Sequence, residues 1–459
     1  MATKRWLGAA VAVAQKTTVT IGGTWANTEA VSLICNGNTL TVTLSTAAAA
    51  STSTVAAALH AAINASDTTT GLTNGETRNL GGQQINEFKD FSATVSGAVI
   101  TLTGTTRGKP FTVTGAEGSA SGTITLATPT VATGPNHFDN ANNWEGGALP
   151  VANDTILFDS GSVGVLYGLD YLLANTVAIS LEITGDYTGQ IGLPQYDVSK
   201  GYAEYRKRYL ELYNTGINSN FVRFTRGVQG LDNHSSIRLY CGGAAAAWTD
   251  LVSAAVRGSA AGTPNIFIRG GTFGDINVIA GRVEFDPPEA QGLSGALVAE
   301  TSLLIGSASA AEEALLICNT PTDLDACEEI RILGGTAHFR CDVDYGGVGS
   351  DSFDIHGGTV HLDPPSGGLA LRDMTVHGGV LYPNHNSGSG SKVTIFKGTV
   401  DMRQSALRRN YDRVVMYGGA YYDPDGLGSS EINLVGCDLS TVTLSIPKNR
   451  KLTLGAVTT

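Results

Sequence analysis

The chain has 459 residues and a net charge of −12, with 58 glycines, 42% apolar residues and only 15% charged residues. This length allows two or more domains, and the apolar fraction is high enough for each to have a core. The acidity and the lack of a basic tract argue against a nucleic-acid partner. Abundant Gly, Thr, Ser, Ala and Val favour β-structure with many tight turns.

Residues 1–16 are predicted to form an N-terminal arm. They begin MATKRWLGAAVAVAQ, a Lys-Arg pair followed by a short, weakly hydrophobic run. Secretory signals have this order of charge and apolar residues, so a cleaved signal is the alternative. We expect instead an ordered arm that Trp6 anchors. No stretch of the sequence reaches the roughly 18 apolar residues of a membrane span, and none is expected.

Residues 17–128 are predicted to form a small α+β sandwich. Two alternating segments, AVSLIC and TLTVTL, flank Asn36-Gly37, which is a strong hairpin signal. After a polar stretch, further strands are expected in FSATV, AVITLTG, PFTVTG and TITLA.

A helix is predicted between the two groups of strands, in STSTVAAALHAAINAS. Val55, Leu59 and Ile63 recur at the spacing of one helix face, so this face should be buried. Ser53 or Thr54 is expected to cap its start.

Three segments of this region, SLICNGNTLTVTL, VAAALHAAINAS and GKPFTVTG, resemble a module that recurs in virion proteins of tailed phages. In that module a hairpin precedes an Ala-rich helix and a closing pair of strands. The resemblance covers roughly the first 130 residues and implies a virion structural role.

Residues 129–173 are predicted to be a linker followed by the entry of a β-solenoid. The segment NNWEGGALPVANDTILF is similar to the entry of Gly-rich solenoids in bacterial surface proteins and phage structural proteins. A Trp beside Gly-Gly can cover the open end of stacked sheets, so Trp144 is expected to be a cap. An acidic cation site around Asp139 and Asp154 is the alternative.

Residues 174–459 are predicted to form a parallel β-helix with inserted loops and coils of about 20 residues. This prediction rests on a repeated segment of the type HGGTVHL. The last glycine of each copy lies at position 271, 281, 335, 358, 379, 398 or 419, and the final four intervals are 23, 21, 19 and 21 residues. The interval from 281 to 335 should hold a diverged coil or a loop, and residues 249–258 look helical.

Within the repeat, Val360, Leu381 and Val400 are expected to form one inward column, with polar residues between the apolar ones. The segment FDIHGGTVHLDPP is one copy of this repeat. We predict a structural role for its histidines and no metal site, because Lys397 and Tyr417 are expected to occupy the coil position of His356 and His377.

The segment GYAEYRKRYLELY, residues 201–213, concentrates tyrosines and cations. Tyr and Arg are enriched in protein interfaces. We predict a strand here and a contact with another subunit or partner through Tyr205, Arg206, Tyr209 and Tyr213. Stacking on nucleic-acid bases and an ordinary solvated strand are the alternatives.

The sequence contains no nucleophile, dinucleotide or zinc-protease signature. Two acidic segments, residues 322–329 and 342–354, are the candidates for a calcium or glycan-cleaving site, but neither has a recognised ligand spacing. No catalytic residue, cofactor or metal ligand is therefore predicted.

The whole chain is similar to tailed-phage virion proteins that join a small N-terminal domain to a Gly-rich solenoid. The resemblance implies a non-enzymatic, self-assembling particle component, such as a capsid decoration, head fibre or tail-associated protein. Implied partners are two further copies in a homotrimer, the major capsid or other virion proteins, and a host-surface glycan. A bacterial surface adhesin and a polysaccharide lyase or hydrolase are the alternatives; the expected location is the virion, otherwise the cell surface.

Overall fold

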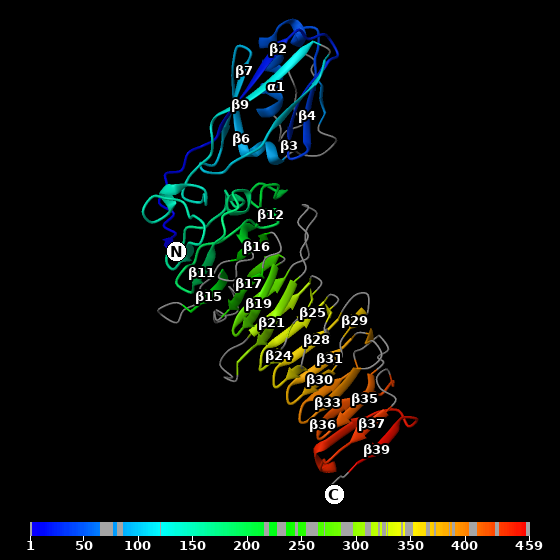
Figure 1. Ribbon diagram of the computed structural model, residues 1–459. Coiled ribbons are helices and arrows are strands. Elements are labelled where there is room, and N and C mark those ends of the chain that lie inside the picture. The colour runs from blue at the N-terminus through cyan, green and yellow to red at the C-terminus, as the bar shows by residue number, and fades with distance from the viewer. Residues whose placement is uncertain are drawn as a thin grey trace.

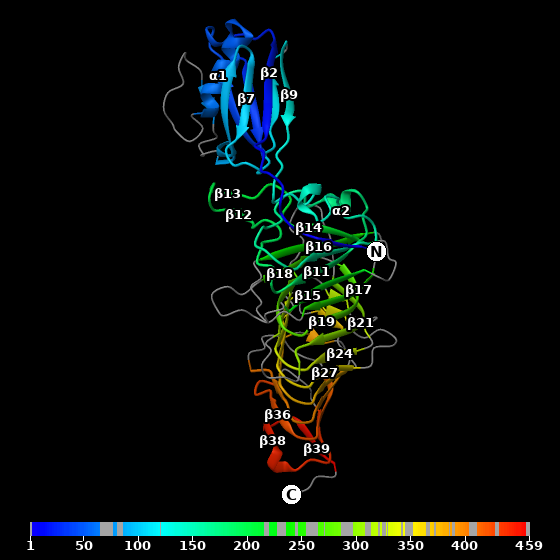
Figure 2. The same ribbon diagram turned by 90° about the vertical axis from the view of Figure 1, so that its left-hand side faces the viewer.

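The computed structural model describes most of the chain. The described residues are 2–64, 77–79, 86–119, 121–214, 220–226, 236–243, 247–253, 265–269, 271–285, 297–307, 314–319, 322–323, 327, 329–340, 343–344, 352–363, 368–370, 373–384, 386–387, 391–403, 411–426 and 431–455. They form a small β-rich domain that stands on one end of a long parallel β-solenoid (Figures 1 and 2). The predicted fold class is confirmed.

The N-terminal domain is a sandwich of two antiparallel four-stranded sheets, in the orders β6-β7-β2-β9 and β5-β4-β3-β8. Its strands are β2 (Lys16–Gly23), β3 (Ala30–Cys35), β4 (Asn38–Thr43), β5 (Thr77–Asn79), β6 (Phe91–Ser96), β7 (Val99–Gly104), β8 (Thr114–Gly118) and β9 (Gly122–Thr130). Its helices are α1 (Thr52–Asn64), η1 (Ala48–Ala50) and η3 (Asn86–Asp90). Of the segment PFTVTG, only Thr114 and Gly115 belong to a strand.

The hairpin β3–β4 forms as predicted. Asn36 and Gly37 have φ angles of 51° and 74°, and these left-handed values fit a tight hairpin turn. The helix is also confirmed, since Val55, Leu59 and Ile63 on α1 are all at most 2% exposed.

The predicted cap of α1 is wrong by two or three residues. The backbone N–H of Thr54 donates to Ser51 Oγ at 3.2 Å, and the N–H of Ser51 donates to Thr54 Oγ1 at 2.9 Å. Ser51, directly before the helix, is therefore the cap, and Thr54 completes a reciprocal pair.

In the solenoid the chain winds in successive coils, and its strands form two long parallel sheets that enclose one hydrophobic core. The larger sheet has 18 strands: β1 (Thr3–Arg5), β10 (Thr155–Phe158), β11 (Ser180–Thr184), β15 (Phe221–Thr225), β17 (Ala247–Ser253), β19 (Gly271–Val278), β21 (Leu297–Ile305), β23 (Thr322–Asp323), β24 (Glu329–Ile332), β26 (Val343–Asp344), β27 (Ser352–Ile355), β29 (Gly368–Ala370), β30 (Asp373–Val376), β32 (Asn386–Ser387), β33 (Ser391–Ile395), β35 (Tyr411–Met416), β37 (Glu431–Leu434) and β39 (Lys451–Leu454).

The smaller sheet has 11 strands: β14 (Leu210–Asn214), β16 (Ile237–Gly243), β18 (Asn265–Arg269), β20 (Gly281–Phe285), β22 (Ala314–Cys318), β25 (Thr336–Phe339), β28 (Thr359–Leu362), β31 (Val380–Pro383), β34 (Thr399–Asp401), β36 (Gly419–Tyr422) and β38 (Val442–Ser445). The remaining elements are β12 (Tyr196–Asp197), β13 (Tyr202–Ala203), α2 (Tyr171–Ala174), η4 (Ala141–Asn143) and η5 (Leu439–Thr441).

The inward column predicted for the repeat is confirmed. Val360 pairs with Leu381 across β28 and β31, Leu381 pairs with Val400 on β34, and all three side chains are fully buried. The glycines turn the corner before each strand. A Cβ on Gly358 would lie 2.3 Å from the carbonyl oxygen of Gly335 in the preceding coil, so the coils stack only where this position lacks a side chain.

The long interval between Gly281 and Gly335 contains one diverged coil. Ala314 pairs with Gly281 and takes the place of the repeat glycine, and Leu316 is the inward residue of this coil. Two other expectations are wrong: Gly271 begins β19 in the larger sheet instead of a strand equivalent to β20, and residues 249–253 belong to β17 instead of a helix. Residues 254–258 of that segment lie outside the described part of the chain.

The N-terminal arm is part of the solenoid. Strand β1 pairs in parallel with β10, so the sandwich is inserted between the first two strands of the larger sheet. Trp6 is 2% exposed and Trp144 is 1% exposed, with their rings in edge contact at 5.0 Å. Phe138 lies 4.9 Å from Trp144 on the other side. The predictions that Trp6 anchors the arm and that Trp144 caps the first coils are confirmed.

Candidate functional site

The Tyr- and Arg-rich segment lies where the sandwich meets the solenoid. Only Tyr202–Ala203 and Leu210–Asn214 are strands, so the single strand predicted through Tyr205, Lys207 and Tyr209 is wrong. Between β13 and β14, Tyr205 and Arg206 instead turn their side chains towards the sandwich. Tyr205 packs against the core of the sandwich.

Asp90, at the end of η3 in the sandwich, is the centre of this junction. Its side chain is 1% exposed. Tyr202 donates a hydrogen bond to Asp90 Oδ2 at 2.6 Å, and Tyr205 donates to the same oxygen at 3.0 Å. Arg206 Nη1 lies 3.5 Å from it. A single carboxylate therefore receives three groups from the solenoid.

Lys109 provides the second connection between the domains. Its ammonium lies 2.9 Å from Asp90 Oδ1 in its own domain and 2.6 Å from Asp197 Oδ2 in the solenoid. Arg206 is held in turn by Glu204, whose two carboxylate oxygens each accept a 2.7 Å hydrogen bond from the guanidinium. Buried charges that are paired in this way fix geometry, because separating them leaves an uncompensated charge in a dry environment.

The pKa values of these groups follow their contacts. Burial and then the hydrogen bond to Asp90 raise the pKa of Tyr202, so its phenol keeps the proton that it donates. Burial acts to raise the pKa of Asp197, but the hydrogen bonds from Lys109 and Ser199 outweigh it and lower the pKa to about 2. The carboxylate of Asp197 is therefore charged at any pH above about 4.

The four residues predicted to contact a partner have contacts within the chain. Tyr205 and Arg206 join the two domains as described above. Tyr209 is 3% exposed and lies under the guanidinium of Arg269, 4.8 Å from ring to cation. Tyr213 is half-buried on β14, opposite Gly242. Tyr205 and Arg206 thus serve an interface between domains, and Tyr209 and Tyr213 have neighbours within the solenoid. The predicted contact with another subunit or partner stays a prediction.

Sequence reasoning missed Asp90, Lys109 and Asp197 in this junction. Asp90 and Lys109 lie about 90 residues or more before residues 201–213, and Asp197 lies just before them, in segments that read as ordinary loops. The Tyr/Arg-rich segment itself was the signal that the sequence offered. Its acidic partners could not be identified, because only the fold brings them next to it.

Two columns of aromatic side chains run along the solenoid. On the smaller sheet His361 lies between His338 and Tyr382, with ring centroids 4.9 and 4.8 Å apart, as predicted. Burial and the neighbouring His338 lower the pKa of His361. His338 Nε2 lies 2.7 Å from Asp363 Oδ2.

The other column lies on the larger sheet and corrects the predicted alignment. His356 stacks on His377 at 4.4 Å, His377 on Phe396 at 4.9 Å, and Phe396 on Tyr417 at 4.8 Å. Phe396 therefore occupies the position expected for Lys397. The motif KGTVDMR has one glycine instead of two, so its first residue aligns one position later than the histidines of HGG. Burial and the neighbouring His377 lower the pKa of His356.

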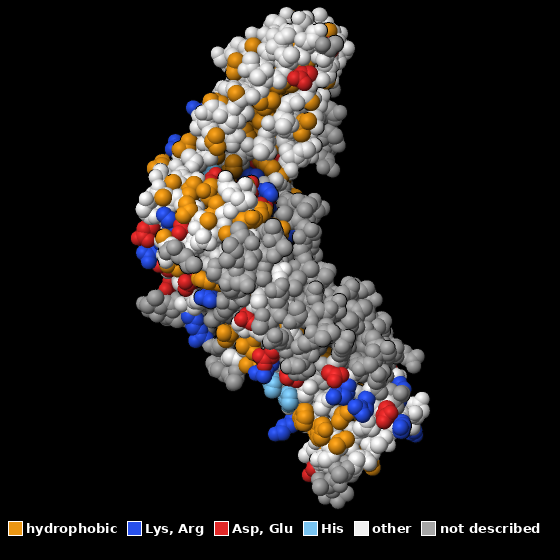
Figure 3. All heavy atoms as spheres, viewed as in Figure 1, with side chains coloured by type: hydrophobic (Ala, Val, Ile, Leu, Met, Phe, Trp, Pro, Cys, Tyr) orange, Lys and Arg blue, Asp and Glu red, His pale blue; other side chains and the backbone are white. Residues whose placement is uncertain are grey.

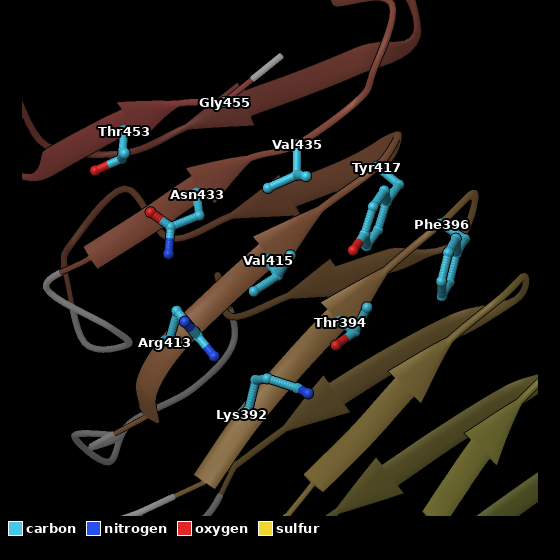
Figure 4. Close-up of a pocket in the computed structure, with 10 residues that line it drawn as sticks. All are labelled: Lys392, Thr394, Phe396, Arg413, Val415, Tyr417, Asn433, Val435, Thr453 and Gly455. Carbon is cyan, nitrogen blue, oxygen red and sulfur yellow. The ribbon is translucent and has the colours of Figure 1, made fainter. Parts of the chain in front are cut away.

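A shallow groove of about 390 Å³ lies on the outer face of the larger sheet, near its C-terminal end. Figure 4 shows Phe396 and Tyr417 along one side of this groove and Lys392 and Arg413 along the other. The floor consists of shorter side chains, namely Thr394, Val415, Asn433, Val435 and Thr453. The arrangement offers ring edges, hydroxyls, an amide and cations to a ligand lying across the strands.

In the residues that the structure describes, Asp139 and Asp154 do not belong to a cluster of three potential metal ligands. Both oxygens of Asp154 accept backbone hydrogen bonds, from Ala2 and Val151. Asp139 lies 3.5 Å from His137 Nδ1. Half of residues 322–329 and most of residues 342–354 lie outside the described part of the chain, and Asp354 lies within it.

No family model matches the chain, and no curated protein is found to match it. Among the described residues, no helix is long and apolar enough to cross a membrane.

Proposed function

We propose that this chain is a non-enzymatic structural protein of a virion surface, which assembles with copies of itself. The observation that carries the proposal is the exposure of the last coil. Leu452 and Leu454 on β39 pair with Ile432 and Leu434, which point into the core. Yet Leu452 is 43% exposed and Leu454 is 56% exposed. Apolar core positions left open to water favour a covering partner.

A second copy of the same chain is the proposed cover. Strand β39 is the outermost described strand of the larger sheet, and β38 is that of the smaller sheet. The ends of these strands and the apolar side chains beside them are the surface that other copies would cover. We propose a homotrimer in which the ends of three chains pack together around one axis, because closed symmetry covers such ends without forming an open fibre.

The sandwich is the proposed attachment domain. Its sequence resembles a module of tailed-phage virion proteins, and the buried charges around Asp90 hold it in line with the solenoid. A rigid rod with a docking domain at one end suits a capsid decoration, head fibre or tail-associated protein that contacts the major capsid or another virion protein. The outer groove suits a further contact with a host-surface glycan.

The groove is also the feature that would favour a glycan-cleaving enzyme on a β-helix. Glycosidases need two carboxylates across the scissile bond, and lyases need a base with a calcium or arginine. The described residues that line the groove include two cations, Lys392 and Arg413, but no carboxylate. We therefore propose binding without cleavage.

The test uses the purified full chain. Native mass spectrometry over a range of concentrations should give three chains per particle, and incubation with neutral and acidic polysaccharides should release no reducing ends or unsaturated products. A monomer that releases such products would contradict the proposal and favour the enzyme.

A further inference from the structure

We propose that Asp354, His356 and His377 bind one zinc-type divalent ion on the outer face of the solenoid. Figure 3 shows histidine side chains at the surface of the solenoid beside acidic and hydrophobic groups. This inference does not depend on the proposed function, because it follows from three donor groups on neighbouring coils.

The strands bring the three donors together. Asp354 on β27 and His356 directly after it are two residues apart, so their side chains point to the same side of the sheet. His377 directly follows β30, the next strand, and its ring stacks on that of His356 at 4.4 Å with an angle of 8° between the planes. Two residues of one strand and one of its neighbour form a compact triangle.

The distances are close to those of a bound ion. One donor atom from each residue lies within 4.8 Å of the others, and Asp354 Oδ1 is 3.9 Å from His377 Nε2. An ion at the centre of such a triangle would be at most about 2.8 Å from each donor. Zinc requires about 2.0–2.2 Å, so each donor must move by roughly 0.7 Å. A metal also binds an imidazole nitrogen in the plane of the ring, so the stacked rings of His356 and His377 must tilt apart to share one ion. Asp354 and His377 are half-buried and His356 is exposed, so these movements take place at the surface.

The surroundings favour one orientation of the donors. Phe396 stacks on the far face of His377 at 4.9 Å and 4° and covers that face of the imidazole. Arg331 on β24 lies opposite Asp354 in the register of the two adjacent strands, and its positive charge would oppose a cation. Its guanidinium, however, forms an ion pair with Glu329, which compensates that charge.

The donor set selects the metal. Two imidazoles and one carboxylate suit Zn²⁺ and its spectroscopic substitute Co²⁺, whereas Ca²⁺ and Mg²⁺ prefer oxygen ligands alone. Three protein ligands leave a fourth position for water. The bound ion would link two adjacent coils and so stabilise the folded solenoid in proportion to its occupancy.

The second histidine column supplies a matched control. His338, His361 and Asp363 are the same residue types on the smaller sheet, but His338 Nε2 is already 2.7 Å from Asp363 Oδ2. His361 is stacked between His338 and Tyr382, away from the proposed site. A variant of His361 therefore removes an imidazole from the same protein without touching the three donors.

The experiment titrates the full chain, without an affinity tag, with Co²⁺ and with Zn²⁺. We expect one Co²⁺ per chain with the visible absorption bands of a tetrahedral site, displacement by Zn²⁺, and a higher melting temperature with Zn²⁺. His377→Gln and Asp354→Asn should each lower the affinity by at least about tenfold, whereas His361→Gln should bind as the wild type does. Circular dichroism of each variant checks folding.

Two results would overturn the proposal. One is the absence of tetrahedral Co²⁺ bands from the wild type at saturating Co²⁺. The other is an equal loss of affinity in His361→Gln and Asp354→Asn, which would indicate scattered binding by surface histidines. Neither result bears on the oligomeric state, so the proposed function would be unaffected.

Discussion

The two ends of the solenoid differ in how well the chain covers their apolar side chains. At the N-terminal end, Trp6 and Trp144 cover the first coils and are almost fully buried, and β1 completes the edge of the sheet. At the C-terminal end, Leu452 and Leu454 occupy inward positions of the last described coil but remain about half exposed. Within the described residues, the chain buries the apolar side chains at one end of its core and leaves those at the other end exposed, which is the difference behind the proposed self-assembly.

Hydrogen bonds, as well as aromatic packing, stabilise the covered N-terminal end. Trp144 Nε1 donates to the carbonyl oxygen of Phe138 at 2.9 Å, and Trp6 Nε1 donates to that of Val163 at 3.0 Å. Asn143 is fully buried, and its amide nitrogen donates to the carbonyl oxygens of Gly134 and His137. The two indole nitrogens and the amide of Asn143 thus all have partners, as buried polar groups in a stable cap require.

The largest effect should come from Trp144→Ala. Removing this fully packed ring should lower the free energy of unfolding by about 3–5 kcal/mol, because it leaves a cavity in the cap. Leu454→Ala, at the open end, should change it by less than about 0.5 kcal/mol. Urea denaturation of the two variants under conditions that keep the chain monomeric checks the difference. Equal losses of unfolding free energy would show that side chains at the two ends contribute equally to stability, which would contradict the comparison.

Asp90→Asn should have the next largest effect, because it acts on the junction beside the capped end. The change leaves Lys109 and Arg206 buried with one fewer anion, and should cost about 3 kcal/mol. Glu145→Gln is the control, because Glu145 forms an exposed ion pair with Arg5 at 3.8 Å, and such surface pairs contribute little to stability. Limited proteolysis between the sandwich and the solenoid should accelerate in the first variant and not in the second.

Acid should loosen the same junction before it affects the C-terminal coils. The pKa of Asp197 is lowered from 3.8 to about 2 in the folded chain. A lowered pKa stabilises the fold above the unfolded value, and this contribution disappears as the pH falls from about 4 to 2. Small-angle X-ray scattering across this window should show the sandwich separating from the solenoid. Asp197→Asn should remove the change within the window; a wild-type profile that is flat there would contradict the assignment.

Much of the fold could be predicted from local pattern. The glycine repeat gives the coil length because a Cβ at Gly358 or Gly379 would collide with the preceding coil. The Asn36-Gly37 turn is equally local. Where the pattern is broken, prediction is less specific: Ala314 replaces a repeat glycine in the interval where only a diverged coil or a loop is expected. The alignment predicted for KGTVDMR is wrong, because its single glycine shifts Phe396 into the column assigned to Lys397.

The sites were harder to predict than the fold. The partners of Tyr205 and Arg206 lie more than 100 residues away, at Asp90 in the sandwich. Asp354 lies close to His377 only because two coils stack in one register. Such neighbours depend on tertiary register, which a single sequence does not specify.

The most direct test of the central claim is the oligomeric mass of a double variant at the open end, Leu452→Asp with Leu454→Asp. Both side chains are already exposed in the single chain, so the variant should fold as the wild type does, with an unchanged circular dichroism spectrum. Analytical ultracentrifugation should give three chains for the wild type and one for the variant, because two carboxylates cannot be buried in an apolar contact. A wild type that is a monomer, or a variant that keeps the mass of the wild-type oligomer, would contradict the account.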